Sequence, residues 1–224
     1  MNSDPNAEAR ASLRAIAAPA ILGLYGFAGA TFMVSANIAG WYGTSDTLEY
    51  LAPFAATFGG LAQFLAGMWS FKARDQLASA LLSMWGSYWI AFGVLYVLAA
   101  AGTLTIPTGA FPAFGFWFIG LGAVTAVRAI AAIPENVGLV TILGTVALGC
   151  GCFAVGLISG TSFWEVIAAY LFIIGALAAF YTASSMLLEG TFGRVVLPLG
   201  RTRQAREKAG ISAGVGEPGV QQGH

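Results

Sequence analysis

Charged side chains are scarce in this chain of 224 residues. They make up 9% of it, as ten Lys and Arg and ten Asp and Glu, whereas a water-soluble domain carries about 25%. This scarcity excludes an ordinary soluble globular protein. It also leaves no basic surface of the kind that binds nucleic acid, outside a short C-terminal stretch. The formal net charge of +0 says little about partners, because the charges are unevenly placed along the chain.

Metal-binding and nucleophilic residues are equally few. The chain has two Cys and one His, and His224 is the last residue, far from any hydrophobic segment. Cys150 and Cys152 lie in a run of small apolar residues, where packing is the expected role and the C-x-C spacing is poor for a disulfide. We therefore expect no metal, no cofactor and no disulfide. The chain also lacks the ligands, carboxylate dyads or nucleotide loop of a redox enzyme, an intramembrane protease or an ATP-driven pump, so we do not expect an enzyme.

Hydrophobic residues, by contrast, make up 58% of the chain, and the mean hydropathy is +0.77. A membrane-spanning helix needs about 20 mainly apolar residues. The uncharged runs predict six such helices, because the longest run is divided by a Pro- and Gly-containing turn at 105–112. The fold class is therefore all-α, with spans at about 15–38, 49–71, 77–101, 110–132, 137–159 and 164–188. A segment at 1–14 precedes them and a disordered tail at 201–224 follows.

The cations occupy alternate junctions between these spans. They lie in the N-terminal segment, in two connections and in the tail, whereas the other connections hold only Asp46, Glu49 and Glu165. This bias predicts that both termini face the cytoplasm, in the inner or plasma membrane. Arg128 lies about one helical turn from the cytoplasmic end of its span, and we expect its side chain to extend outward to the interface. Asp4 and Glu8 argue against a signal peptide at the first span.

Inside the spans the polar residues are neutral. Phe27, Thr31 and Ser35 recur every four residues and therefore share one face of a helix, with Asn37 near its outer end. Gly60, Gln63 and Gly67 share a face of the second span, and the third carries Trp85, Ser87, Tyr88 and Trp89. Such donors suit a small solute with one polar and one apolar end. Glycine faces and aromatic clusters also serve plain helix packing, so the residues alone do not name a solute.

Four stretches resemble the acetate uptake transporter family, the succinate–acetate permease group. They are residues 18–27, 59–67, 86–89 and 192–200, which stand in the family's order and cover nearly all of the predicted spans. Two residues of the opening motif differ, since Ala18 stands where the family has Asn and Ile21 where it has Pro. The positions that carry the resemblance are Pro19, Leu22, Gly23, Leu24, Gly26, Gly60, Gly193, Arg194 and Pro198.

The resemblance implies a six-helix protomer that assembles as a hexamer, with a pathway for acetate, and in some members succinate, in each protomer. It also implies an aromatic constriction, which would fall on Phe27 and Trp85, with Trp85 in place of the family's Tyr. A Leu of the fifth span completes the family's constriction, but no motif places it here.

These observations together lead to a functional hypothesis. Phe27 and Trp85 form a narrow apolar gate, and Thr31, Ser35, Asn37, Gln63 and Ser87 bind the carboxylate on either side of it. Because no carboxylate or His lies within the spans, we favour channel-like passage or co-movement of the protonated acid. Two alternatives stay open: a channel for a neutral solute such as ammonia, urea or water, and a non-transporting structural subunit of a membrane complex.

Overall fold

The computed structural model describes residues 17–202, and six helices in this range are long and apolar enough to cross a membrane. The predicted all-α fold class is confirmed, since the described residues contain no β-strand. The helices are α2 (Pro19–Ile38), α5 (Gln76–Ala100), α6 (Pro112–Ala132), α7 (Val137–Ser159) and α8 (Ser162–Phe192), and one span built from α3 (Thr47–Phe54), η1 (Ala55–Ala62) and α4 (Gln63–Lys72). The predicted segment 1–14 and residues 203–224 of the predicted tail lie outside the described residues.

Local signals fix the ends of several helices. Pro19 and Pro112 stand in the first turns of α2 and α6, where a missing N–H has no cost. The carboxylate of Asp75 accepts from the Ala78 N–H at 2.8 Å and caps α5, which is typical of an N-cap Asp. Gly160 and Gly193 end α7 and α8 with φ of 69° and 65°, a conformation that favours glycine. These helix ends therefore coincide with a cap or a stop in the sequence.

The segment after α8 packs back on the bundle. Arg201 forms an ion pair with Glu189 at 2.6 Å, and the Thr202 hydroxyl donates to the Pro134 carbonyl. The Val137 N–H donates to the Gly200 carbonyl at 3.3 Å. Residues 201 and 202 of the predicted tail therefore pack on the bundle, where a charge on α8 holds Arg201.

The second span contains a π-helix, η1, between its two α-helical parts. Pro53 lies in α3 just before it, and the Thr57 hydroxyl donates back to the Pro53 carbonyl at 2.8 Å. Glycine allows neighbouring helices to approach η1 closely: a Cβ on Gly26 would lie 2.5 Å from the Phe58 carbonyl oxygen, and one on Gly60 would lie 2.9 Å from the Ile90 nitrogen. The glycines at these positions are required by packing.

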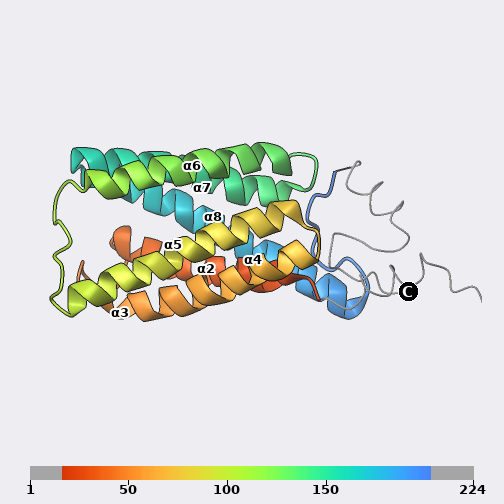
Figure 1. The fold of residues 1–224 in the computed structure, drawn as a ribbon. Helices are drawn as coiled ribbons and strands as arrows, with labels where there is room; N and C mark the ends of the chain where they lie inside the picture. The colour runs from red at the N-terminus through yellow and green to blue at the C-terminus, as the bar shows by residue number, and fades with distance from the viewer. Residues whose placement is uncertain (1–16, 203–224) are drawn as a thin grey trace, which may run out of the picture.

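Figure 1 shows the arrangement of the spans. α6, α7 and α8 pack together along one side, and α2, the η1-containing span and α5 pack together along the other, with α2 also packed on α8. α5 and α6 touch much less. The connections 73–75 and 133–136 and the segment 193–202 lie at one end of the bundle, which holds the described cations Lys72, Arg74, Arg128, Arg194 and Arg201. We refer to it as the cationic end.

Candidate transport pathway

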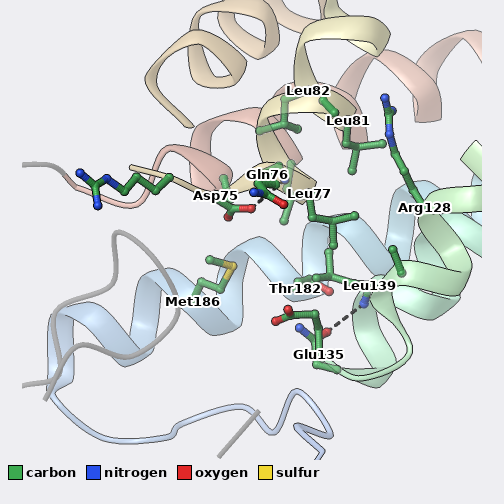
Figure 2. Close-up of a pocket in the computed structure, with 17 residues that line it drawn as sticks. Asp75, Gln76, Leu77, Leu81, Leu82, Arg128, Glu135, Leu139, Thr182 and Met186 are labelled. Atoms are coloured by element: carbon green, nitrogen blue, oxygen red, sulfur yellow. Dashed lines mark hydrogen bonds between the residues drawn. The ribbon is translucent and has the colours of Figure 1, made fainter. Parts of the chain in front are cut away.

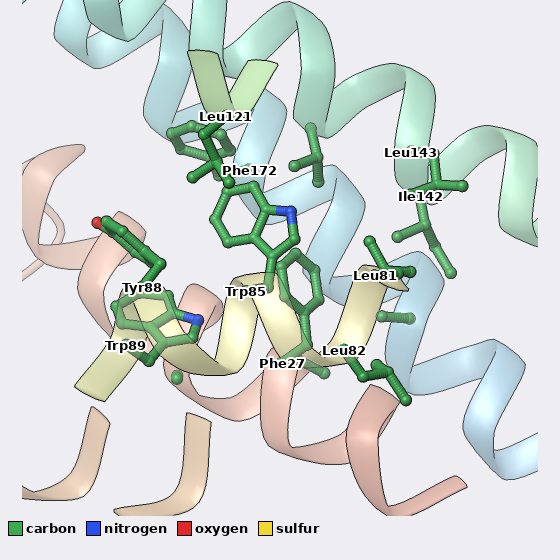
Figure 3. Packing of buried hydrophobic residues seen from close by; sticks show 14 of the residues in the cluster. Phe27, Leu81, Leu82, Trp85, Tyr88, Trp89, Leu121, Ile142, Leu143 and Phe172 are labelled. Carbon is green, nitrogen blue, oxygen red and sulfur yellow. The ribbon is translucent and has the colours of Figure 1, made fainter. Parts of the chain in front are cut away.

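Phe27 of α2 and Trp85 of α5 meet in the middle of the bundle. Their ring centroids are 5.5 Å apart with an interplanar angle of 82°, and 4% and 2% of the two residues are exposed. The Trp85 indole N–H donates to the Thr125 hydroxyl of α6 at 3.3 Å. That hydroxyl donates in turn to the Leu121 carbonyl at 2.7 Å. Figure 3 shows the edge-to-face contact of the two rings, which we call the constriction.

A cavity of about 10 Å³ lies against the constriction. We call it the middle cavity. Besides Phe27 and Trp85, its wall is formed by the Gln63 side chain and by six aliphatic residues of α2, α5 and α7: Leu24, Leu81, Leu82, Ile142, Leu143 and Val146. The three residues of α7 are the contribution of the fifth span, and Leu143 is the Leu among them.

Gln63 is the polar side chain of the middle cavity. Its exposed fraction is 0%, and within residues 17–202 neither its amide nitrogen nor its amide oxygen has a hydrogen-bond partner. A buried amide without partners is unfavourable by about 1–3 kcal/mol for each group. An amide both donates and accepts, so Gln63 presents two unused hydrogen-bonding groups beside the constriction.

A second cavity of about 50 Å³ lies on the far side of Trp85 from the cationic end. Thr31 and Ser35 of α2 contribute hydroxyls to its wall, and most of the remaining wall is aromatic: Tyr88, Trp89, Phe92, Tyr96, Phe114, Phe118, Phe153 and Phe172, together with Trp85. We call it the aromatic chamber. The Thr31 hydroxyl and the Trp89 indole N–H are buried and have no partner among the described residues. Both are free to hydrogen-bond a solute.

A third cavity, of about 460 Å³, opens at the cationic end. We call it the vestibule, and Figure 2 shows the side chains of α5, α6 and α8 that line it. Its polar groups include Asp75, Arg128, Glu135 and Thr182. Burial raises the pKa of the Asp75 carboxyl above its usual value, and the nearby charge of Glu135 adds to this effect, while the hydrogen bond from the Ala78 N–H opposes it.

The three cavities share walls. Leu24, Leu81 and Leu82 line both the vestibule and the middle cavity, and Trp85 lines both the middle cavity and the aromatic chamber. They therefore follow one another along the bundle and are separated at the constriction. Neutral polar groups therefore lie directly on both sides of the aromatic barrier, and charged groups are found in the vestibule.

The comparisons with known proteins agree with this architecture. A family model described as the GPR1/FUN34/yaaH family matches residues 2–199. The chain belongs to this family. The resemblance predicted from the four sequence stretches is thereby confirmed.

Relatives within the family include transport proteins. The succinate-acetate/proton symporter SatP of Escherichia coli is 24% identical over 194 residues, which cover 84% of this chain and 97% of SatP. Acetate permease A of Emericella nidulans is 28% identical over 201 residues, covering 83% of this chain and 66% of the permease. A solved structure of the bacterial acetate channel SatP matches with a TM-score of 0.76 at 24% identity, covering 83% of this chain and 99% of that one.

Residues of the family motifs mostly shape the backbone around the pathway. Gly23, Gly26 and Gly60 lie where a Cβ would meet a neighbouring helix, and Leu24 lines two of the cavities. The Pro198 carbonyl accepts from the Tyr181 hydroxyl at 2.9 Å. Leu22 faces outward, and Arg194 is exposed just after Gly193 at the cationic end.

Two predicted pathway residues lie elsewhere. Ser87 is exposed, and its hydroxyl donates to the Ser83 carbonyl of its own helix at 2.7 Å; it stands two residues, about 200° around the helix, from Trp85. Asn37 is buried, but its amide N–H groups donate to the carbonyls of Tyr42 and Thr44 at 2.8 and 3.1 Å. Ser87 therefore does not line the pathway, and Asn37 holds the connection after α2 in place.

Arg128 also differs from expectation. Its predicted outward extension is wrong: 8% of the residue is exposed, and the guanidinium Nη2 donates to the Met84 sulfur at 2.8 Å. In residues 17–202 no group of three or more His, Cys, Asp or Glu is arranged to hold a metal ion.

Proposed function

We propose that the chain is a membrane transporter or channel for acetate and other short carboxylates, succinate included. The observation that carries this proposal is the line of three cavities interrupted by the Phe27–Trp85 constriction, with the unpartnered Gln63 amide on one side and the Thr31 hydroxyl on the other. The named activities of SatP and acetate permease A support it.

The physical basis is the carboxylate of the substrate. A short carboxylic acid has a pKa of about 4.3 and is therefore an anion near neutral pH. Neutral donors replace the water that the anion loses and still bind weakly enough to release it. The rings of Phe27 and Trp85 admit the methyl end of acetate and oppose a bulkier group. Gln63, Thr31 and Ser35 are the residues that we assign to the carboxylate.

Uptake of labelled acetate into proteoliposomes tests this function. We expect uptake that follows the acetate gradient, with and without a pH gradient at a fixed acetate anion concentration, because the described spans hold no carboxylate midway to carry a proton. Absence of uptake under every gradient contradicts the proposal, and uptake that requires the pH gradient contradicts channel-like passage.

Phe27→Ala tests the constriction. Removal of the ring widens the barrier, so we expect succinate flux to rise relative to acetate flux. Phe32→Ala is the matched control, since Phe32 lies on the same helix with its ring partly exposed. An unchanged ratio of the two fluxes in Phe27→Ala removes Phe27 from the gate.

A neutral solute is the second candidate. A yeast relative named ammonia transport outward protein 2 is 34% identical over 89 residues, covering 40% of this chain and 31% of that protein. Ammonia flux that acetate does not inhibit, in vesicles that fail to take up acetate, favours this candidate.

We further propose that both ends of the chain face the cytoplasm, in the inner or plasma membrane, and that six copies form a hexamer. The placement of Lys72, Arg74, Arg194 and Arg201 at one end supports the orientation. The native mass of the purified protein in detergent tests the hexamer, and labelling of a Cys introduced at an exposed position of 101–111 tests the orientation.

A further inference from the structure

Arg128 is a cation that the bundle buries. Lys72, Arg74 and Arg194 are exposed at the same end, whereas only 8% of Arg128 is exposed. Arg74 and Arg128 both line the vestibule, Arg74 as an exposed side chain and Arg128 as a buried one. Figure 2 shows Arg128 extending from α6 beside Leu81 of α5. Its environment is therefore very different from that of the other cations.

The guanidinium of Arg128 contacts α5 at the residue next to Trp85. Nη2 contacts the sulfur of Met84 at 2.8 Å, and Met84 is the neighbour of Trp85 in the sequence. Thr125, one helical turn before Arg128, accepts the Trp85 indole N–H. Arg128 thus stands at the inner end of the vestibule, about one turn from the constriction.

The guanidinium has no anionic partner in the described chain. A thioether is a weak acceptor, and Nη1 is buried without a hydrogen bond. Asp75 and Glu135 line the same vestibule, but neither forms an ion pair with Arg128; the ion pair found in residues 17–202 joins Arg201 to Glu189. A buried guanidinium without a counter-anion is strongly unfavourable, and an anion that enters the vestibule relieves this.

We propose that Arg128 binds the carboxylate of the substrate at the inner end of the vestibule, immediately before the constriction. The inference rests on the proposed function and adds a charged binding site to its neutral pathway. The free N–H groups of the guanidinium match a carboxylate, while Leu81, Leu82 and Leu24 form an apolar wall for the methyl group. The carboxylates of Asp75 and Glu135 weaken the attraction of the vestibule for anions, which favours release.

Direct binding to the purified full-length protein tests the site. Equilibrium dialysis with labelled acetate compares the wild type with Arg128→Gln, which keeps a polar side chain but removes the charge, and with Arg194→Gln, which removes an exposed cation at the same end. We expect acetate affinity to fall about tenfold or more in Arg128→Gln, because hydrogen bonds to charged groups contribute that much, and to stay unchanged in Arg194→Gln. Equal affinity in wild type and a folded Arg128→Gln overturns the inference.

A measurement on the wild type keeps the test valid if Arg128→Gln does not fold. Acetate supplies the missing partner of Arg128, whereas acetamide has the same shape and no charge. Acetate should therefore raise the unfolding temperature more than acetamide at equal concentration, with ionic strength matched by sodium chloride. Equal shifts with the two compounds overturn the inference.

Transport measurements distinguish failure of the Arg128 site from failure of the proposed function. In proteoliposomes Arg128→Gln should raise the acetate concentration for half-maximal uptake about tenfold and change the maximal rate little, since the constriction is intact. Wild-type uptake together with unaltered half-saturation in Arg128→Gln refutes the Arg128 site alone. Acetate binding that depends on Arg128 without any wild-type uptake refutes the proposed function alone.

Discussion

Replacement of Gln63 by Met should make the protein more stable and a poorer transporter. Both amide groups are buried and have no partner among the described residues. Each such group costs about 1–3 kcal/mol. Met is unbranched and close to Gln in size, so it fills the same space beside Leu82 and Trp85 without these costs. We expect the free energy of unfolding to rise by about 2 kcal/mol or more.

Unfolding by sodium dodecyl sulfate in mixed micelles, followed by tryptophan fluorescence, measures the first effect, and labelled acetate uptake measures the second. Gln76→Met is the stability control, because Gln76 is exposed at the start of α5 and an exposed substitution changes stability by about 0.5 kcal/mol or less. We expect uptake to fall in Gln63→Met, since the donor beside the constriction is gone.

The test requires stability to rise and uptake to fall in the same variant. If Gln63 had only a structural role, its replacement would lower the stability of the protein, and if Gln63 were dispensable, its replacement would leave uptake intact. Lower stability in Gln63→Met refutes the reasoning about unpartnered groups. Higher stability with unchanged uptake removes Gln63 from the pathway.

Two further predictions concern the backbone and the vestibule. Gly26→Ala places a Cβ 2.5 Å from the Phe58 carbonyl oxygen and should lower the free energy of unfolding by about 1–3 kcal/mol. Gly120→Ala is the control, because nothing lies within 4 Å of that position, and it should raise the free energy of unfolding by up to about 1 kcal/mol. Equal effects of the two substitutions in the same detergent titration contradict the packing argument. Asp75→Asn should weaken the pH dependence of stability. Burial raises the pKa of Asp75 above 3.8, so the folded state binds the proton more tightly than the unfolded state. The free energy of unfolding of the wild type therefore falls as pH rises through the interval above 3.8. Unfolding measured across this interval should show a shallower decline in Asp75→Asn, and equal slopes in the two proteins count against a buried Asp75.

Much of the fold follows from the sequence because the span signal is local. Length and apolarity set the six helices, and Pro19, Pro112 and Gly193 mark helix ends. The four-residue spacing of Phe27, Thr31 and Ser35 likewise predicts a shared buried face, which the structure has. The same spacing rule would have excluded Ser87, which stands about 200° from Trp85 around the helix.

Other features depend on contacts that no local sequence pattern encodes. Asn37 binds carbonyls of a connection whose conformation no local pattern dictates. The inward direction of Arg128 depends on Met84 of α5, 44 residues earlier. Neither contact leaves a signal in a single sequence, so the sequence predicts where such residues lie along a helix and not what they touch.

The π-helix of the second span has a consequence for the whole pathway. A π-helix holds about one residue more in each turn than an α-helix, so η1 acts as a phase shift between α3 and α4. Every side chain from Gln63 to Lys72 therefore faces a direction that a continuous α-helix would give to a different residue. The position of the Gln63 amide in the middle cavity thus depends on the number of residues between Phe54 and Gln63, as well as on which residues they are. Length, and not only composition, is a constraint on this span.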